Sequence, residues 1–134
     1  MTVFVDTAHF VALLDRRDRL HDRAVELTRE LARQARPLVT SDGVLVELGN
    51  YFARGPLRAA SIDWIYALRG AEGWEIEAWS SATVARAEAL YRAHPDKTWS
   101  LTDCASMELM RDRRIRDVAT TDRGFAQAGF RTLL

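Results

Sequence analysis

Apolar and polar positions along the chain follow two spacings that alternate with each other. Short runs rich in β-branched and aromatic residues are typical of buried strands, and apolar residues repeated every three or four positions are typical of amphipathic helices. The pattern predicts strands over residues 2–6, 38–40, 74–79, 117–120 and 130–133. It predicts helices that begin at residue 7, near residue 19, at residue 41 or 42, after residue 56, at residue 80 and at residue 100. This alternation favours one three-layer α/β domain, residues 1–134, with a parallel sheet of five strands.

Two of the predicted elements have a distinctive pattern. In segment 74–79, apolar and acidic residues alternate with a period of two, as in an edge strand or a half-buried strand. In the helix after residue 56, Trp64, Ile65 and Leu68 form an apolar stripe. Such a stripe usually packs into the core, although it can also contact a partner protein.

The composition indicates a globular protein of one domain. A chain of 134 residues is long enough to bury a core without disulfides, and its single cysteine, Cys104, excludes an internal disulfide. The lone cysteine fits a reducing cytoplasm. Neither a membrane-spanning apolar run nor a signal peptide is found, so we expect a cytoplasmic protein that does not contact the membrane.

The charges sum to zero, with 19 basic and 19 acidic residues. No overall positive field therefore points to a nucleic acid. Lys97 is the only lysine, and all the other basic residues in this count are arginines. A compositional bias of the genome explains this preference, and it is also compatible with a polyanionic substrate because arginine binds phosphate with two parallel hydrogen bonds.

Four acidic residues stand where a strand gives way to a helix or where a helix begins. They are Asp6, Glu47, Asp103 and Asp122. In open parallel sheets the ligand site lies beyond the carboxyl ends of the strands, at a point where the strand order reverses. Asp6 and Asp122 each follow a predicted strand, so these two carboxylates would face each other if the first and fourth strands are neighbours.

Clustered carboxylates repel one another unless a cation neutralises them. Mg²⁺ and Mn²⁺ prefer oxygen ligands and are commonly held by a few carboxylates together with water and phosphate. The four acidic residues therefore predict a metal-dependent enzyme that acts on phosphate esters.

Each acidic residue also has a simpler interpretation. Asp6 and Asp122 stand where N-caps stand, and Asp103 can form a capping box with Ser100, three residues earlier. Glu47 borders the apolar face of its helix instead of the opposite face, which is less typical of a solubilising residue. Spacing alone does not separate a cap from a metal ligand, because one carboxylate can do both.

Several motifs together resemble a known family. They are Val-Phe-Val-Asp-Thr at 3–7, Glu47 in the third helix, Ser-Leu-Thr-Asp-Cys-Ala-Ser at 100–106, and Thr-Thr-Asp-Arg-Gly-Phe-Ala-Gln-Ala-Gly-Phe at 120–130. In this order they resemble a PIN domain, and within that family the VapC-type toxin ribonucleases of bacterial toxin–antitoxin pairs. The resemblance covers the whole chain, and its last two motifs are the specific ones.

The resemblance implies a sheet of strand order 3-2-1-4-5 with the acidic residues at its carboxyl edge. It assigns Asp6, Glu47, Asp103 and Asp122 to a Mg²⁺ or Mn²⁺ site, with the hydroxyls of Thr7 and Thr121 in support. We take Asp6 and Asp103 as direct ligands of the metal. One departure is Gly124, where similar sequences often carry a larger side chain, and this concerns local contacts with substrate.

The same resemblance implies the substrate and the partners. They are RNA, a cognate antitoxin whose tail lies across the active site, and a second copy of the chain in a homodimer. Arg54, Arg58 and Arg123 are candidates for positioning RNA, because they flank the break at residues 55–56 and the last aspartate. Asp96 is a candidate fifth carboxylate at the rim.

The sequence is also compatible with different functions. A phosphohydrolase with an aspartyl nucleophile usually has a second aspartate two residues after the first, and here that position is Ala8. A stand-alone RNA-processing nuclease and a non-catalytic scaffold that binds RNA or protein are two further hypotheses. Cys104 is interpreted as core, and the three histidines, His9, His21 and His94, as surface residues without a role in the chemistry.

Overall fold

A computed structural model describes all residues, 1–134, as five strands and seven helices. The strands are β1 (Val3–Val5), β2 (Leu38–Ser41), β3 (Trp74–Glu77), β4 (Asp117–Ala119) and β5 (Arg131–Thr132). The helices are α1 (Thr7–Leu14), α2 (His21–Arg33), α3 (Asp42–Tyr51), α4 (Arg58–Arg69), α5 (Ser81–Ala93), α6 (Leu101–Asp112) and α7 (Arg123–Gln127). Every strand and helix that the sequence predicts is present, and most boundaries differ by a few residues.

The five strands form one sheet in the order β3-β2-β1-β4-β5, and every pair of neighbours is parallel. This confirms the predicted order 3-2-1-4-5. In the central pair, Val3 lies opposite Asp117 and Val5 opposite Ala119. The chain leaves both strands at the same edge, so Asp6 and the residues after Ala119 begin their turns next to each other. Strand β3 is an edge strand, as its alternating pattern predicts.

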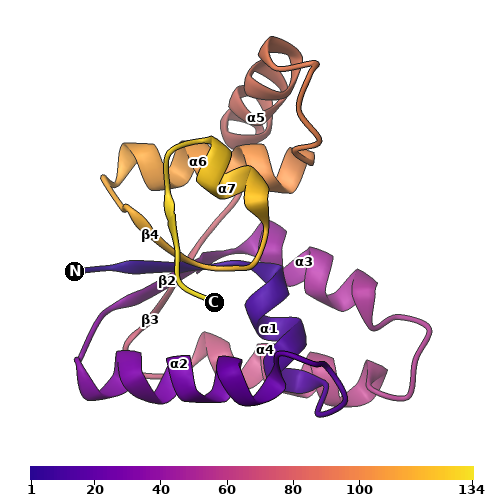
Figure 1. The fold of residues 1–134 in the computed structure, drawn as a ribbon. Coiled ribbons are helices and arrows are strands. Elements are labelled where there is room, and N and C mark those ends of the chain that lie inside the picture. Colours follow the sequence, from indigo (N-terminus) through magenta and orange to yellow (C-terminus); the bar gives the residue numbers. More distant parts are fainter.

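Helices cover the sheet from both sides (Figure 1). In the view shown, α6 and α7 lie above the strands, α5 packs on the outer side of α6, and α1, α2 and α4 lie below. Helix α3 contacts both α1 and α6, so it bridges the two layers at the carboxyl end of the sheet. The resulting fold is the predicted three-layer α/β domain.

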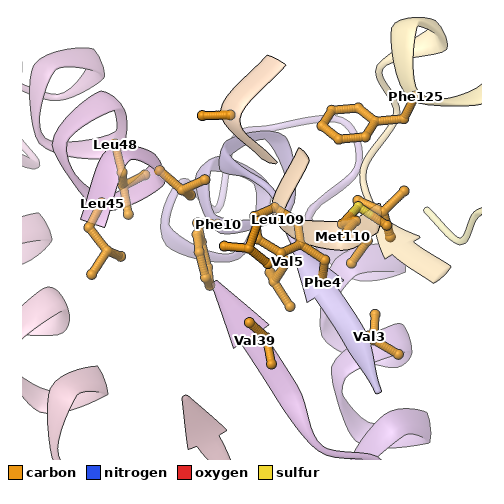
Figure 2. Packing of buried hydrophobic residues seen from close by; sticks show 14 of the residues in the cluster. Val3, Phe4, Val5, Phe10, Val39, Leu45, Leu48, Leu109, Met110 and Phe125 are labelled. Atoms are coloured by element: carbon orange, nitrogen blue, oxygen red, sulfur yellow. The ribbon is translucent and has the colours of Figure 1, made fainter. Parts of the chain in front are cut away.

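The core is one cluster of apolar side chains on both faces of the sheet (Figure 2). Val3, Phe4 and Val5 are almost completely buried, which explains why β1 is apolar without alternation. Phe10 of α1 packs edge-on against Trp64 of α4, with ring centroids 4.9 Å apart. Burial of aromatic rings of this size contributes strongly to stability.

The apolar stripe of α4 belongs mainly to this core. Ile65 and Leu68 are buried, and Trp64 is half-buried against Phe10. The exposed apolar side chains of this helix are Ile62 and Tyr66. The α4 stripe is therefore explained by packing within the chain.

At the amino edge of the sheet, a buried aspartate is neutralised by two arginines. Asp117 begins β4 and is 4% exposed. Arg131 donates two hydrogen bonds to its carboxylate, at 2.8 and 2.7 Å, and Arg36 donates a third. Arg36 also donates to the carbonyl of Met1 at 2.8 Å. This network ties β4, β5 and the segment before β2 together, and the bonds from Arg131 and Arg36 hold the pKa of Asp117 below its usual value.

None of the seven helices is both long enough and apolar enough to cross a lipid bilayer.

The network around Asp117 leads to a prediction for stability. Asp117→Asn should lower the free energy of unfolding at pH 7 by about 2–3 kcal/mol, because the mostly buried Arg36 loses its counter-charge. A carboxylate with a lowered pKa stabilises the fold above the pKa of the unfolded chain, about 4, and that contribution disappears as the pH falls further. Urea unfolding of both proteins at pH 7 and pH 3 measures the difference, which should shrink at pH 3.

The matched control is Asp112→Asn, since Asp112 pairs with Arg86 on the exposed surface. It should have a much smaller effect, because exposed ion pairs contribute little. Equal effects of the two substitutions would contradict a special role for the Asp117 network.

Candidate active site

The four predicted acidic residues line one cavity at the carboxyl edge of the sheet. The cavity has a volume of about 330 Å³. Its lining residues are Asp6, Thr7, Ala8, Val11, Asp18, Leu20, Glu47, Tyr51, Asp103, Thr121 and Asp122. The lining contains five carboxylates and no arginine, lysine or histidine. A cavity of this kind is electrostatically unfavourable until a cation enters it.

Asp6 occupies the N-cap position of α1, but its side chain makes no capping hydrogen bond. Instead, Thr120 donates a hydrogen bond from its Oγ1 to Asp6 Oδ2 at 2.9 Å. Asp6 is 4% exposed. Burial and the nearby charge of Asp103 raise the pKa of Asp6 to about 7. The capping interpretation therefore does not describe Asp6. The predicted cap, Thr7, is the first residue of the helix.

Asp103 combines both interpretations that the sequence left open. Its backbone N–H donates to Ser100 Oγ at 3.0 Å, and its Oδ2 accepts from the Ser100 N–H at 2.9 Å, so the capping box is present. Its side chain also lines the acidic cavity. Burial, followed by the charges of Asp122 and Glu47, raises the pKa of Asp103 to about 6, although the bonds from Ser100 lower it in part.

Glu47 and Asp122 lie at the border of the cavity. Glu47 is half-buried in the middle of α3. Asp122 caps α7 by accepting the Gly124 N–H at 2.7 Å. Its own N–H donates to Thr120 Oγ1 at 3.1 Å. Because the same hydroxyl donates to Asp6, Thr120 links the ends of β1 and β4.

Of the threonines in the site, Thr120 was not predicted. Thr120 is completely buried, whereas the predicted Thr121 is exposed and lines the cavity. Thr7 lines the cavity as predicted, and its buried Oγ1 has no hydrogen-bond partner. A buried hydroxyl without a hydrogen-bond partner is uncommon. Thr7 lines the same cavity as carboxylates that have oxygens without hydrogen bonds.

The predicted arginines do not line the acidic cavity. Arg54 and Arg58 are exposed beyond the end of α3, and Arg58 donates to the carbonyl of Ala53. Arg123 is exposed beside Asp122. Asp96 pairs loosely with Lys97, outside the cavity.

The carboxylate at the rim is Asp18, in the loop between α1 and α2. Its Oδ1 accepts the Leu20 N–H at 2.8 Å, so the side chain also shapes this loop. A loop aspartate has no distinctive spacing, so nothing in the sequence separated Asp18 from the other loop aspartates.

One interpretation of the histidines is wrong. His9 is 2% exposed, and Thr28 uses its own proton to bind Ala24, so His9 Nε2 donates to Thr28 Oγ1 at 2.9 Å. Burial lowers the pKa of His9 to about 4. His9 is thus a neutral residue between α1 and α2, and His21 and His94 are half-buried. Cys104 is buried, as expected.

The donor set fits a hard divalent cation. All potential ligands in the cavity are oxygens, as Mg²⁺ and Mn²⁺ prefer, and Asp6 and Asp103 each keep one oxygen that makes no hydrogen bond within the chain. No three acidic, histidine or cysteine side chains converge as a ready-made metal shell. The fit therefore rests on the oxygen chemistry, the orphan Thr7 hydroxyl and the raised pKa values of Asp6 and Asp103.

The family follows from comparison with known proteins. The family model described as PIN domain matches residues 3–131, which is nearly the whole chain. The chain belongs to the PIN domain family. No curated protein sequence matches it.

Solved structures with the same fold include VapC20 of Mycobacterium tuberculosis, described as a sarcin-ricin loop cleaving toxin. This structure has a TM-score of 0.82 and 26% identity, over 96% of this PIN domain and 95% of VapC20. The resemblance to VapC-type proteins is thereby confirmed.

Two further structures are less similar in sequence. FitAcB of Neisseria gonorrhoeae has 17% identity and a TM-score of 0.66, over 98% of this chain and 96% of its own. VapBC2 of Rickettsia felis, solved with a fragment of promoter DNA, has 14% identity and a TM-score of 0.68, over 99% and 98% of the two chains. At these identities, the likeness shows the fold alone.

The raised pKa of Asp6 leads to a prediction for the PIN domain without metal. In the unfolded chain Asp6 ionises near pH 4, and in the folded chain near pH 7, so the folded state binds the extra proton between these values. In EDTA, the free energy of unfolding should therefore decrease from pH 4 to pH 7 and remain low above pH 7. Asp6→Asn should remove the part of this decline that comes from Asp6, leave the smaller part from Asp103, and stabilise the protein at pH 8 by about 2–4 kcal/mol.

Thermal unfolding at a series of pH values in EDTA measures this effect. Asp96→Asn is the matched control, since Asp96 is exposed and lies outside the cavity. If Asp6→Asn and Asp96→Asn give the same pH profile as the unchanged protein, Asp6 does not carry a raised pKa.

Proposed function

We propose that this PIN domain is a Mg²⁺- or Mn²⁺-dependent endoribonuclease that hydrolyses phosphodiester bonds of RNA, and that it is the toxin of a VapBC-type pair. The observation that carries the proposal is the acidic cavity, which is lined by carboxylates from β1–α1, α3, α6 and β4–α7 and by no basic side chain. Such an arrangement suits a cation that in turn binds a phosphate group.

Each residue of the cavity has a role in this proposal. Asp6 and Asp103 hold the cation through their free oxygens, and Thr120 and Ser100 fix the orientation of these two carboxylates. Glu47 and Asp122 bind the cation directly or hold its water molecules, and Thr7 and Thr121 supply hydroxyls. A bound divalent cation would lower the pKa of a water molecule and stabilise the charge that develops on the phosphate.

Similarity to VapC20 supports RNA as the substrate, because that protein is described as cleaving the sarcin-ricin loop and is 26% identical over 96% of this chain. An RNA chain needs positive charge beside the acidic cavity. Of the predicted arginines, Arg123 is the one next to a cavity residue, and we retain it as a candidate contact to phosphate. Arg54 and Arg58 are candidates only for a more distant part of the RNA.

The similarity to VapC20, which is described as a toxin, supports a cognate antitoxin as the partner. Apolar side chains beside the cavity offer a surface for it: Tyr51 of α3 is 63% exposed and lines the cavity, and Val46 on the same helix is 62% exposed. An antitoxin segment bound there would cover the carboxylates. We also propose a homodimer, because the resemblance to VapC-type proteins implies one.

The decisive prediction concerns cleavage by the purified protein without antitoxin. Wild-type protein should cleave RNA with Mg²⁺ or Mn²⁺ and not in EDTA. Asp6→Asn and Asp103→Asn should each lower the rate by at least about 100-fold, because each removes a charged oxygen that holds the cation. Gel analysis of end-labelled RNA measures the rates. Asp63→Asn, at an exposed aspartate that lines neither cavity, is the control and should cleave at the wild-type rate.

A second measurement on the same samples separates a wrong substrate from a wrong site. Mg²⁺ should raise the melting temperature of wild-type protein, and this rise should disappear in Asp6→Asn. Metal-dependent stabilisation without RNA cleavage would show that the site is right and the substrate wrong. Absence of both effects would contradict the nuclease and favour a non-catalytic scaffold.

A further inference from the structure

A second cavity has chemistry opposite to that of the acidic cavity. It measures about 270 Å³ and is formed by the end of α5 and the loop before α6. Its lining residues are Tyr91, Arg92, His94, Pro95, Lys97 and Trp99. Three of these are aromatic or heteroaromatic, two are cations and none is acidic. The volume is slightly below the usual range of about 300–1,000 Å³ for drug-sized ligands, so it suits a small planar group.

The rings of this cavity are held in place by the chain. Trp99 is 6% exposed, and its Nε1 donates to Gln127 Oε1 at 3.2 Å. The His94 ring lies 4.9 Å from the Trp99 ring, centroid to centroid. His94 Nδ1 donates to the carbonyl of Leu90 at 3.2 Å, so in the neutral ring Nε2 is a hydrogen-bond acceptor. Two sides of the cavity are therefore rigid.

Tyr91 differs from the other two rings because its side chain has no stacking or hydrogen-bond partner within the chain. Its side chain is 52% exposed and stacks on no other ring, and its hydroxyl makes no hydrogen bond within the chain. A nucleobase can stack on an aromatic ring that has no partner within the chain, as in Tyr91, beside the fixed rings of His94 and Trp99.

The cations of the cavity are available to a phosphate. Arg92 makes no ion pair, and Lys97, the only lysine of the chain, has just a loose contact of 3.5 Å with Asp96. Elsewhere on the surface, arginines such as Arg86 and Arg113 are tied to carboxylates. Positive charge next to exposed aromatic rings is the combination that binds single-stranded nucleic acid.

Gly124 connects this cavity to the acidic one. A Cβ atom at Gly124 would lie 2.7 Å from Trp99 Cδ1 and 3.0 Å from Asp122 Oδ1. The indole and the carboxylate thus approach Gly124 from two sides, and only glycine leaves room for Trp99 there. This explains the departure at Gly124 in physical terms: the space of a larger side chain is taken by Trp99.

We propose that the cavity lined by Tyr91, His94 and Trp99 binds a base of single-stranded RNA close to the scissile phosphate, with Arg92 and Lys97 on the adjoining phosphates. The inference rests on the proposed ribonuclease function and deepens it. A strand whose phosphate lies at the carboxylates reaches this cavity across the border formed by Trp99, Gly124 and Asp122. The aromatic cavity then selects an unpaired nucleotide near the cleavage position.

The test compares Tyr91→Ala with Tyr66→Ala, since Tyr66 is a similarly exposed tyrosine on α4. With a single-stranded RNA oligonucleotide, Tyr91→Ala should raise KM by about tenfold or more while kcat changes less than about twofold, because base stacking contributes to binding. Tyr66→Ala should change neither. Circular dichroism and melting temperature verify that both variants are folded.

Removal of single bases from the RNA identifies the stacked nucleotide. One abasic position near the cleavage site should raise KM by the same factor as Tyr91→Ala, and the two changes together should not add, as expected for two groups that contact each other. Additive effects at every position, or an unchanged KM for Tyr91→Ala, would overturn the subsite.

A binding measurement keeps this inference separate from the nuclease proposal. Fluorescence anisotropy of a labelled RNA oligonucleotide gives its affinity for Asp6→Asn protein with and without the Tyr91→Ala change. Weaker binding of the double variant supports the subsite even if wild-type protein cleaves no RNA. Equal binding overturns the subsite even if metal-dependent cleavage is established.

Discussion

The burial of two carboxylates without a protein counter-ion, Asp6 and Asp103, is the constraint on which the structure of the site depends. Burial makes their charge costly, and neighbouring carboxylates add to this cost, Asp103 for Asp6 and Asp122 and Glu47 for Asp103, so both pKa values are raised. The fold holds them with neutral hydrogen-bond donors instead of cations: the Thr120 hydroxyl for Asp6 and the Ser100 backbone N–H for Asp103. These hydrogen bonds fix orientation without neutralising charge. The neutralising partner has to come from outside the chain.

The opposite edge of the same sheet shows what a purely structural aspartate looks like. Asp117 is as buried as Asp6, but Arg36 and Arg131 surround it and lower its pKa. Strand β4 begins at this satisfied carboxylate and leads to the unsatisfied ones at its other end. The carboxylate at the amino edge of the sheet thus stabilises the fold, whereas the carboxylates at the carboxyl edge are buried without a cation, which is unfavourable. Functional sites often carry such locally unfavourable arrangements.

The alternation of strands and helices predicted the three layers, and the resemblance to PIN domains implied the strand order. Four of the five carboxylates of the cavity were predicted, because strand ends and helix starts leave clear local signals. The sequence did not separate Thr120 from Thr121, since which hydroxyl turns inward depends on how β4 pairs with β1. Asp18 and the burial of His9 also escaped prediction. Both depend on how α2 packs against α1, and this packing is a tertiary property without a sequence pattern of its own.

Gly124 shows how a local departure gains meaning from the structure. In the sequence it is an exception to the family pattern, and in the fold it is the place where Trp99 approaches Asp122. Asp122 lines the acidic cavity, Trp99 lines the aromatic and basic one, and both side chains approach Gly124. The proposed metal site and the proposed site for a single strand would thereby fall on neighbouring surfaces of a domain whose net charge is zero.

No protein cation lines the cavity of Asp6 and Asp103, and we propose that a divalent metal binds these two carboxylates. The most direct measurement is an NMR titration of the aspartate side-chain carbons, with EDTA and with Mg²⁺. Without metal, the pKa values of Asp6 and Asp103 should be about 7 and about 6, and saturating Mg²⁺ should lower both. Ordinary pKa values near 4 in EDTA, or raised values that Mg²⁺ leaves unchanged, would contradict the account.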